Sequence, residues 1–305
     1  MTIELVPAPA GAVVVAVDGS SLADEALRWA AAYATRTGAP LHVVHAFVYV
    51  HAMGGYAVFD PADPEELGGK VCEDAVSVVR AGYPDLPVTA EVRLGPAAPQ
   101  LLKAAKDAAA IVLGARGHGR VGGMLIGSVS QQVAMHARCP VVVVRGSGEH
   151  AGGPVVVGLD GSPEAARALR FALGYAGGVG APVRAVRSTY LEAPPGVPPG
   201  AWYGDLMERV EELTRTVRAQ VEAARGEFPG VDLDLRIVHR HPVEALVEEA
   251  DDAQLLVVAS RGLGGFTGLL LGSVSQGVLS RSRLPVAVIP RSGEERELGE
   301  ERQIP

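Results

Sequence analysis

The stretch that decides the fold is VVVAVDGSSLADEALRWAAAYA, residues 13–34, because the chain repeats it as VVVGLDGSPEAARALRFALGYA at residues 155–176. Thirteen of these 22 positions are identical, at an offset of 142. A second block, residues 116–133, aligns with residues 261–278 at 11 of 18 positions, at an offset of 145. Solenoid repeats have periods of only ~20–50 residues. We therefore interpret the 305-residue chain as one whole domain written twice.

Each copy alternates short β-branched runs with longer amphipathic stretches. In copy one we expect strands near 12–17, 40–47, 87–93, 110–114 and 140–145, and helices near 21–37, 63–82, 97–107 and 128–137. In copy two we expect strands near 154–159, 182–188, 232–238, 254–259 and 285–289, and helices near 163–177, 205–226, 242–251 and 273–281. This alternation predicts an α/β fold of two doubly wound domains, each with a five-stranded parallel sheet and helices on both faces. Such sheets bind ligands beyond the carboxyl ends of their strands.

The sequence divides at two places. Residues 146–153 are rich in Gly and Ser and predict a flexible linker between a domain at 1–147 and a domain at 153–293. Residues 294–305 are rich in Glu and Arg, and we expect a charged C-terminal tail that frays.

Composition excludes several classes of protein. Hydrophobic residues make up 48% of the chain and the mean hydropathy is +0.21, so general disorder is excluded. The net charge of −8 argues against nucleic-acid binding. We expect no membrane span and no secretory signal, because apolar runs are short and the N-terminus lacks a basic segment. Two cysteines, Cys72 and Cys139, cannot form a disulfide framework, and a reducing cytoplasm is the natural interpretation.

A glycine-rich loop follows the fourth expected strand of each copy. Residues 114–128 read GARGHGRVGGMLIGS, with the form G-x2-G-x9-G-S. Glycines let backbone N–H groups approach an anion, and Gly127-Ser128 opens a helix whose free N–H groups favour phosphate. The hydroxyls of Ser128 and Ser130 would add donors. A surface loop with an ordinary Ser cap is the alternative, but its repetition in copy two favours a phosphate cradle.

Copy two differs at the first glycine of this motif. Ala259 replaces it, and its methyl group could press on a phosphate. The loop of copy one also contains G-x-G-x-x-G, but it follows the fourth strand, so we reject a dinucleotide fingerprint. The chain has no G-x4-G-K-[ST] and hence no Walker A lysine.

An Asp-Gly-Ser sequence follows the first strand of each copy, beginning at Asp18 and Asp160. This carboxylate could bind a ribose hydroxyl or help to hold Mg²⁺, or it could form an Asx-turn before the helix. The second strands end differently, in His45-Ala46-Phe47 and Arg187-Ser188-Thr189, so the two pockets could differ in their base contacts. Residues 49–60 and 190–203 could form lids or, more simply, linkers.

Two other chemistries have little support. His239 and His241 are close in sequence, but copy one lacks partners for a repeated zinc site. Nothing matches the G-x-S-x-G of a Ser-His-Asp hydrolase.

The strand-one Asp, the G-x2-G-x9-G-S loop and the last strand (Pro140 followed by four valines) together resemble the universal stress protein family. The resemblance covers nearly the whole chain twice, as in tandem members. It implies the strand order 3-2-1-4-5, and members with this motif bind ATP, often with Mg²⁺. It also implies dimerisation through the last strand, so the two copies could pair within one chain, and a homodimer of two chains is a further expectation.

The resemblance gives each copy a set of ATP-binding positions. Asp18 would contact the ribose, the backbone near Ala46 the adenine, and the glycine loop the phosphates. The implied residues are Asp18, Ala46, Gly114, Gly117, Gly127, Ser128, Val129 and Ser130 in copy one, and Asp160, Ser188, Ala259, Gly262, Gly272, Ser273, Val274 and Ser275 in copy two.

The resemblance implies a stress-response nucleotide binder that regulates an unknown protein partner. We expect no enzyme, because no residue is an evident general base or catalytic lysine. The alternative is a slow ATPase, or an enzyme that phosphorylates itself at Ser128 or Ser273, using the same cradle. A third class is an interaction module with vestigial pockets.

Overall fold

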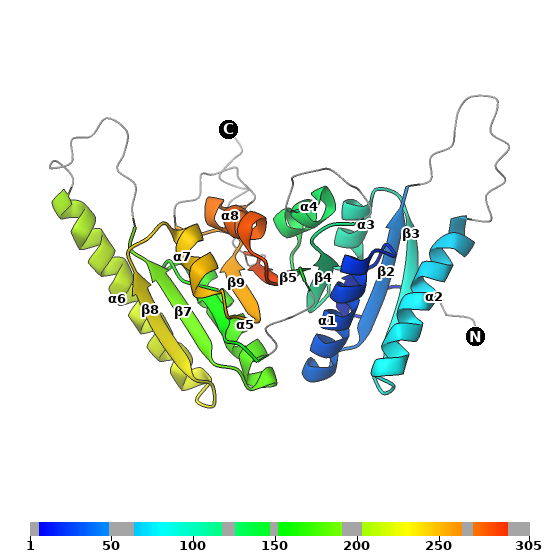
Figure 1. The fold of residues 1–305 in the computed structure, drawn as a ribbon, viewed down its shortest axis with the longest axis horizontal. Helices are drawn as coiled ribbons and strands as arrows, with labels where there is room; N and C mark the ends of the chain where they lie inside the picture. The colour runs from blue at the N-terminus through cyan, green and yellow to red at the C-terminus, as the bar shows by residue number, and fades with distance from the viewer. Residues whose placement is uncertain are drawn as a thin grey trace, which may run out of the picture. The chain divides into compact units, whose positions relative to one another are not determined.

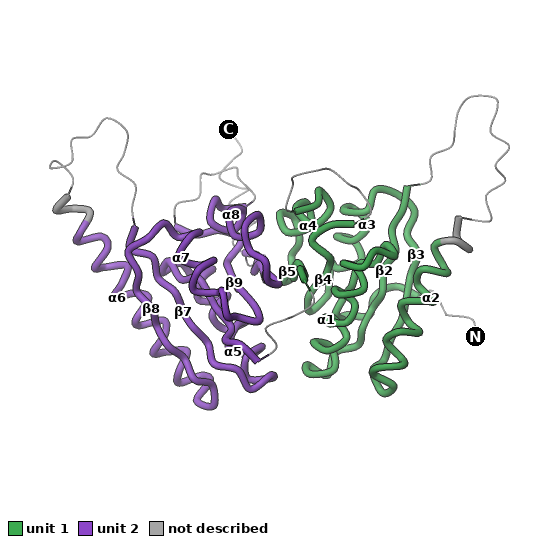
Figure 2. The backbone as a smooth tube through the Cα atoms, in the orientation of Figure 1, with its two compact units in different colours: residues 1–147 green, residues 148–305 purple. Residues whose placement is uncertain are grey.

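The computed structural model describes residues 6–48, 64–117, 126–146, 152–190, 203–263 and 271–291, with the backbone alone at 64–67 and 203–206. The chain divides into two compact units, Met1–Ser147 and Gly148–Pro305 (Figure 2). The expected lid at 49–60, most of the one at 190–203, and the tail at 294–305 lie outside the described residues.

Unit 1 is a five-stranded parallel sheet in the order β3-β2-β1-β4-β5 (Figure 1). Helices α1 and α2 pack together on one face, and α3 packs with α4. In chain order its elements are β1 (Val13–Ala16), α1 (Ser21–Thr37), β2 (Leu41–Phe47), α2 (Pro64–Gly82), β3 (Val88–Leu94), α3 (Ala97–Ala104), β4 (Ala110–Gly114), α4 (Ser128–His136) and β5 (Val141–Val144).

Unit 2 repeats this architecture, with its parallel sheet in the order β10-β9-β6-β7-β8. Its elements are β6 (Val155–Gly158), α5 (Pro163–Val179), β7 (Val183–Ser188), α6 (Tyr203–Glu227), β8 (Leu233–Val238), α7 (Pro242–Glu249), β9 (Leu255–Ala259), α8 (Ser273–Arg281) and β10 (Val286–Ile289). The fold class and the strand order 3-2-1-4-5 of each copy are therefore confirmed.

The central strands are continuous apolar runs because helices cover both of their faces. Val13, Val14 and Val15 of β1 are fully buried, as are Val155, Val156 and Val157 of β6. The high hydropathy of the chain therefore resides in these strands. Among the described residues, no helix is long and apolar enough to cross a membrane.

The helices that follow the first strands have matching ends. The hydroxyls of Ser20 and Ser162 each accept a hydrogen bond from the backbone N–H three residues later, Ala23 N and Ala165 N, and so cap α1 and α5. Gly38 and Gly180 end these helices with φ of 66° and 69°, a left-handed conformation that glycine adopts without steric cost.

Unit 1 buries a small polar network between β2 and β3. The ring of His42 is fully buried between Thr89 Oγ1, 2.8 Å from Nδ1, and Glu91 Oε1, 3.1 Å from Nε2. Arg93 Nε donates to the same Glu91 oxygen at 2.7 Å. Burial lowers the pKa of His42 despite the opposing effect of Glu91.

Both cysteines are buried free thiols in unit 1. Cys72 of α2 donates a hydrogen bond to Glu91 O at 3.6 Å. Burial raises the pKa of Cys72 and of Cys139 to about 11.

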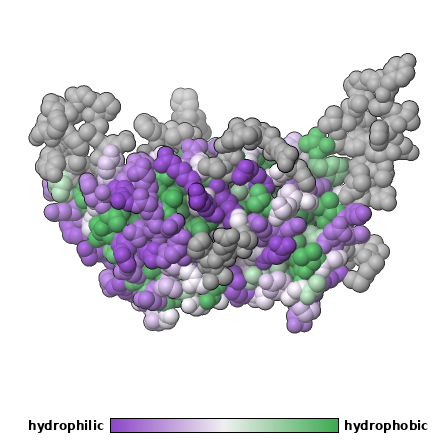
Figure 3. Space-filling model, in the orientation of Figure 1, coloured by the Kyte–Doolittle hydropathy of each residue, from purple (hydrophilic) through white to green (hydrophobic). Residues whose placement is uncertain are grey.

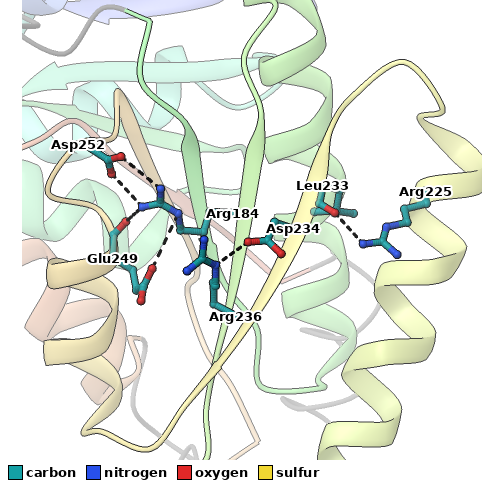
Figure 4. A network of polar contacts seen from close by, with 7 residues as sticks. All are labelled: Arg184, Arg225, Leu233, Asp234, Arg236, Glu249 and Asp252. Carbon is teal, nitrogen blue, oxygen red and sulfur yellow. Dashed lines mark hydrogen bonds and ion pairs between the residues drawn. The ribbon is translucent and has the colours of Figure 1, made fainter.

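Unit 2 has a different polar network, between β7 and α7 (Figure 4). Arg184 donates two hydrogen bonds to Asp252, at 2.9 and 3.2 Å, and a third to the carbonyl of Glu249 at the end of α7. Arg236 and Asp234 form a separate pair along β8. Hydrophilic residues cover much of the described surface in the view of Figure 3, with smaller hydrophobic areas between them.

Candidate functional site

A cavity of about 410 Å³ opens at the carboxyl ends of the strands in unit 2. The switch in strand order lies between β6 and β9, and residues from both strand ends line the cavity. All eight positions implied for copy two are in its wall: Asp160, Ser188, Ala259, Gly262, Gly272, Ser273, Val274 and Ser275. The structure therefore brings this whole set of sequence-derived residues to one place.

Asp160 forms the Asx-turn that was the alternative interpretation of this residue. Its Oδ1 accepts hydrogen bonds from Ser162 N at 2.9 Å and from Ser162 Oγ at 2.6 Å. Asp18 makes the same two bonds with Ser20, at 3.0 and 2.6 Å. A carboxylate has about four lone-pair sites. The turn uses the first oxygen and leaves the second, Oδ2, to face the glycine loop.

The glycine loop approaches this carboxylate closely. Leu263 N donates to Asp160 Oδ2 at 2.8 Å. A Cβ atom added at Gly262 would lie 2.1 Å from Asp160 Oδ2, and one added at Gly117 would lie 2.1 Å from Asp18 Oδ2. The second glycine of the motif is therefore required in both units, because any side chain would displace the Asp. The Asp-Gly-Ser loop and the glycine loop therefore lie side by side in both units.

The far end of the loop returns to the strand end. Gly272 N donates to Ser260 O at 2.8 Å, and Gly127 N donates to Ala115 O at 2.7 Å. Helices α8 and α4 then begin at Ser273 and Ser128, and no side chain caps either helix at its N-terminus. The first N–H groups of α8 are therefore available at the cavity wall, where Ser273 and Val274 lie. The middle of each glycine motif, 118–125 and 264–270, lies outside the described residues.

The hydroxyls of Ser130 and Ser275 have another role than expected. Ser130 Oγ donates to Gly114 O at 2.7 Å, and Ser275 Oγ donates to Ala259 O at 2.9 Å. A hydroxyl has one proton to donate. The expectation that the Ser130 hydroxyl donates to a phosphate is therefore wrong, because these buried hydroxyls tie the helix start to the strand end. Their backbone N–H groups remain the candidate phosphate donors.

Ala259 does not close the cavity that its methyl group borders. In unit 1 a Cβ atom at the equivalent Gly114 would lie 2.9 Å from Leu22 O and 3.2 Å from Leu22 Cβ, both at the start of α1. In unit 1, glycine at position 114 is thus required by the packing of α1 against β4. The structure gives no reason to regard Ala259 as disabling the second site.

The remaining wall of the cavity is mostly apolar. Val186, Leu246 and Val258 contribute side chains from β7, α7 and β9. Gly158 lies in the same wall, and a Cβ atom there would approach the Leu246 methyl groups to 3.1 Å. Copy one has Ala16 at the position of Gly158, so this glycine widens the cavity of unit 2 specifically. The sequence comparison of the two copies could have revealed this difference.

Arg261 supplies a positive charge to the cavity wall. Partial burial lowers its pKa, and the nearby Arg291 lowers it further, while Glu164 raises it. Arg291 is itself paired with Glu164, with 3.3 Å between Nε and Oε1. Arg261 can thus present its guanidinium group to an anionic ligand.

The residues implied for unit 1 occupy the equivalent positions. Asp18 follows β1, Ala46 lies in β2, Gly114 ends β4, and Gly117 and Gly127 flank the part of the loop outside the described residues. Ser128, Val129 and Ser130 form the first turn of α4. No group of three or more His, Cys, Asp or Glu side chains within the described residues is arranged to hold a metal ion.

The family model described as "Universal stress protein family" matches residues 10–145 and 153–290. The chain belongs to the universal stress protein family. A universal stress protein of Mycolicibacterium smegmatis is 36% identical over 287 residues, covering 91% of this chain and 96% of the relative. One from Mycobacterium tuberculosis is 34% identical over 293 residues, with 92% and 96% covered. Both relatives thus match the tandem arrangement over almost their full length.

Solved structures have the same fold as this universal stress protein over both of its units. One from Archaeoglobus fulgidus has a TM-score of 0.63 at 20% identity and covers 92% of this chain and 98% of its own. A protein of Pseudomonas aeruginosa described as functionally unknown has a TM-score of 0.64 at 17% identity, with 96% of each chain covered. At such low identities the likeness concerns the fold alone.

Proposed function

We propose that this universal stress protein binds ATP in the cavity of unit 2 and acts as a nucleotide-dependent regulator rather than as an enzyme. The observation that carries the proposal is that all eight implied residues of copy two line one cavity of about 410 Å³ at the switch point of a parallel sheet.

The chemistry of the wall suits the three parts of a nucleotide. The uncapped N-terminus of α8, the Ser273 hydroxyl and Arg261 together suit the phosphates. Asp160 accepts three hydrogen bonds, so Oδ2 retains one lone pair for a ribose hydroxyl. The apolar side chains of β7, β9 and α7 suit the flat face of a base.

Mg²⁺ would bind in this site as a complex with the nucleotide. Asp160 is the one carboxylate among the described residues that line the cavity. Because its turn and the glycine loop already use most of its acceptor sites, the phosphates would supply the principal oxygen ligands of the ion. This fit is compatible with Mg-ATP as the bound species.

The donor set favours binding over turnover. Among the described residues that line the cavity there is neither lysine nor histidine. Positioned general bases and cationic side chains are what fast phosphoryl transfer needs. Ser273 is exposed in the wall, and this favours slow autophosphorylation there as the second candidate function. Steady-state turnover of about one per minute or more, abolished by Gly262→Ala, would support an enzyme instead.

Nucleotide extraction from the purified chain, followed by mass spectrometry, tests binding directly. We expect ATP to accompany the wild-type protein. Gly262→Ala should lose the ATP of unit 2, because its Cβ atom would lie 2.1 Å from Asp160 Oδ2. Gly174→Ala in α5 is the matched control, since nothing lies within 4 Å of its added Cβ atom. Absence of nucleotide from the wild type, with no ATP binding by calorimetry, would refute the proposal.

The regulatory role includes partners. We expect the last strands of the two units to pair with each other within the chain. We also expect an unknown protein partner to bind the nucleotide-bound and nucleotide-free forms with different affinity. A homodimer is a further expectation, which light scattering of the purified chain would test. The two buried free thiols are compatible with the reducing cytoplasm.

A further inference from the structure

Gln220 of helix α6 forms hydrogen bonds with the loop of unit 2 that begins at Asp160. Its Nε2 group donates to Gly161 O at 3.1 Å and to Ser162 O at 3.2 Å. Both amide protons are therefore used on two successive carbonyls of the loop that begins at Asp160. Gln220 lies 58 and 59 residues from these partners, so the bonds fasten a separate helix to the loop.

The loop that Gln220 holds is tightly constrained. Gly161 has a φ of 93°, a left-handed conformation that favours glycine. A Cβ atom added at Gly161 would point toward α6 and lie 3.6 Å from both Leu213 Cδ2 and Thr216 Cγ2. Ser162 is buried and caps α5 while donating to Asp160. Movement of the α6 side chains would therefore move the Asp160 carboxylate.

Unit 1 has no side-chain amide at the equivalent position of α2. The buried residues of the two helices align at an offset of 145, with Cys72, Val76 and Val79 of α2 equivalent to Val217, Val221 and Ala224 of α6. This alignment places Ala75 where unit 2 has Gln220. A methyl group cannot donate a hydrogen bond, so the Asp18 loop has no equivalent amide from α2.

The Gln220 side chain also buries a polar atom, which packing alone does not explain. Its Oε1 atom is buried and has no hydrogen-bond partner among the described residues. A buried acceptor without a hydrogen bond destabilises the folded state. An apolar residue, as in unit 1, would avoid this cost, so the amide is better explained by what it holds.

We propose that Gln220 is a positioning residue for Asp160 that couples nucleotide binding in unit 2 to helix α6. This inference rests on the proposed function of the cavity. Thermodynamic linkage makes the coupling reciprocal: a ligand that orders the Asp160 loop strengthens the docking of α6, and docking of α6 strengthens ligand binding by the same factor.

Hydrogen–deuterium exchange of the full chain, with and without Mg-ATP, tests this coupling. In the wild type we expect ATP to slow exchange in α6 and in residues 156–166. Gln220→Ala should bind ATP in unit 2 about five- to tenfold more weakly, a typical effect of losing one such hydrogen bond. It should also lose the ATP-dependent protection of α6 while keeping that of the glycine loop. Gln220→Glu, which cannot donate to the carbonyls, should behave like Gln220→Ala.

Two further variants separate positioning from general stability. Arg218→Ala, at an exposed position of the same helix, should leave both readouts unchanged. Ala75→Gln tests whether the amide can confer the link on unit 1, and protection of α2 by ATP would extend the inference. Wild-type affinity and α6 protection in Gln220→Ala would overturn the inference but leave the proposed function intact. A wild type that binds no ATP would overturn the proposed function itself.

Discussion

Single side chains determine how the two carboxylates of the Asp-Gly-Ser loops are used. One oxygen of each Asp shapes the backbone, and the other faces a glycine that must have no side chain. Asp18 and Asp160 are therefore structural and candidate ligand residues at once, and the two interpretations of the sequence do not exclude each other. The same holds for Ser130 and Ser275, whose hydroxyls donate to the strand ends while their N–H groups lie in the uncapped first turns of α4 and α8.

His42 gives unit 1 a pH dependence of known sign. Its folded-state pKa lies below its ordinary value of about 6.5, so the unfolded chain binds more protons near neutral pH. Its contribution to stability is complete above pH 6.5 and is lost as the pH falls below it. We expect urea unfolding at pH 7.5 and pH 5.5 to show a larger loss of stability in the wild type than in His42→Gln.

The charged groups that face His42 are Glu91 and Arg93, and His42→Gln leaves their mutual ion pair in place. The difference between the two proteins therefore isolates the imidazole. Equal losses in both would mean that His42 does not contribute to the pH dependence.

At the scale of elements, the two units use different devices to fix their helices. Unit 2 ties β7 to the end of α7 through Arg184, which satisfies the Glu249 carbonyl and pairs with Asp252 (Figure 4). Unit 1 has His42 at the equivalent strand position and turns it toward Glu91 of β3 instead. The copies thus preserve the arrangement of helices and strands while exchanging the polar contacts between them.

Arg184→Ala should destabilise unit 2 by about 1–2 kcal/mol, because it removes hydrogen bonds to a helix end and a half-buried ion pair. Arg236→Ala removes an exposed ion pair on the neighbouring strand and should match the wild type within error. Urea unfolding of the two variants measures the difference. Equal stability of Arg184→Ala and Arg236→Ala would show that the bridge between β7 and α7 contributes little.

Much of the fold was predictable, because parallel strands and their helices have strong local patterns. Every strand and helix lies where the hydrophobic alternation indicates, and the proximity of Asp160 to Gly262 follows from the topology of the sheet. The acceptor of the Ser275 hydroxyl and the partners of Gln220 were not predictable, because they depend on side-chain contacts between elements distant in sequence. The effect of Ala259 likewise depended on which atoms its methyl group faces.

For the whole molecule, duplication provides two folded units whose nucleotide affinities can differ. The cavity described in unit 2 has Gly158 and Gln220 where unit 1 has Ala16 and Ala75. A ligand that binds only the native state stabilises it by RT ln(1 + [L]/Kd), about 2.7 kcal/mol at 100 times Kd. Nucleotide should therefore separate the unfolding of the two units.

Scanning calorimetry with increasing Mg-ATP should move the transition of unit 2 to higher temperature before that of unit 1. Gly262→Ala should abolish the shift of unit 2, and Gly117→Ala should spare it. A single transition that both variants shift equally would contradict independent sites.

The two thiols of unit 1 have a consequence for how this protein would experience oxidative conditions. A thiol with a pKa of about 11 is almost entirely protonated at neutral pH, and the thiolate is the form that attacks peroxides and disulfides. Cys72 and Cys139 are, in addition, shielded from solvent. Cys72 and Cys139 are therefore poorly suited to sense oxidants directly, and their burial fits a role in packing the core of unit 1.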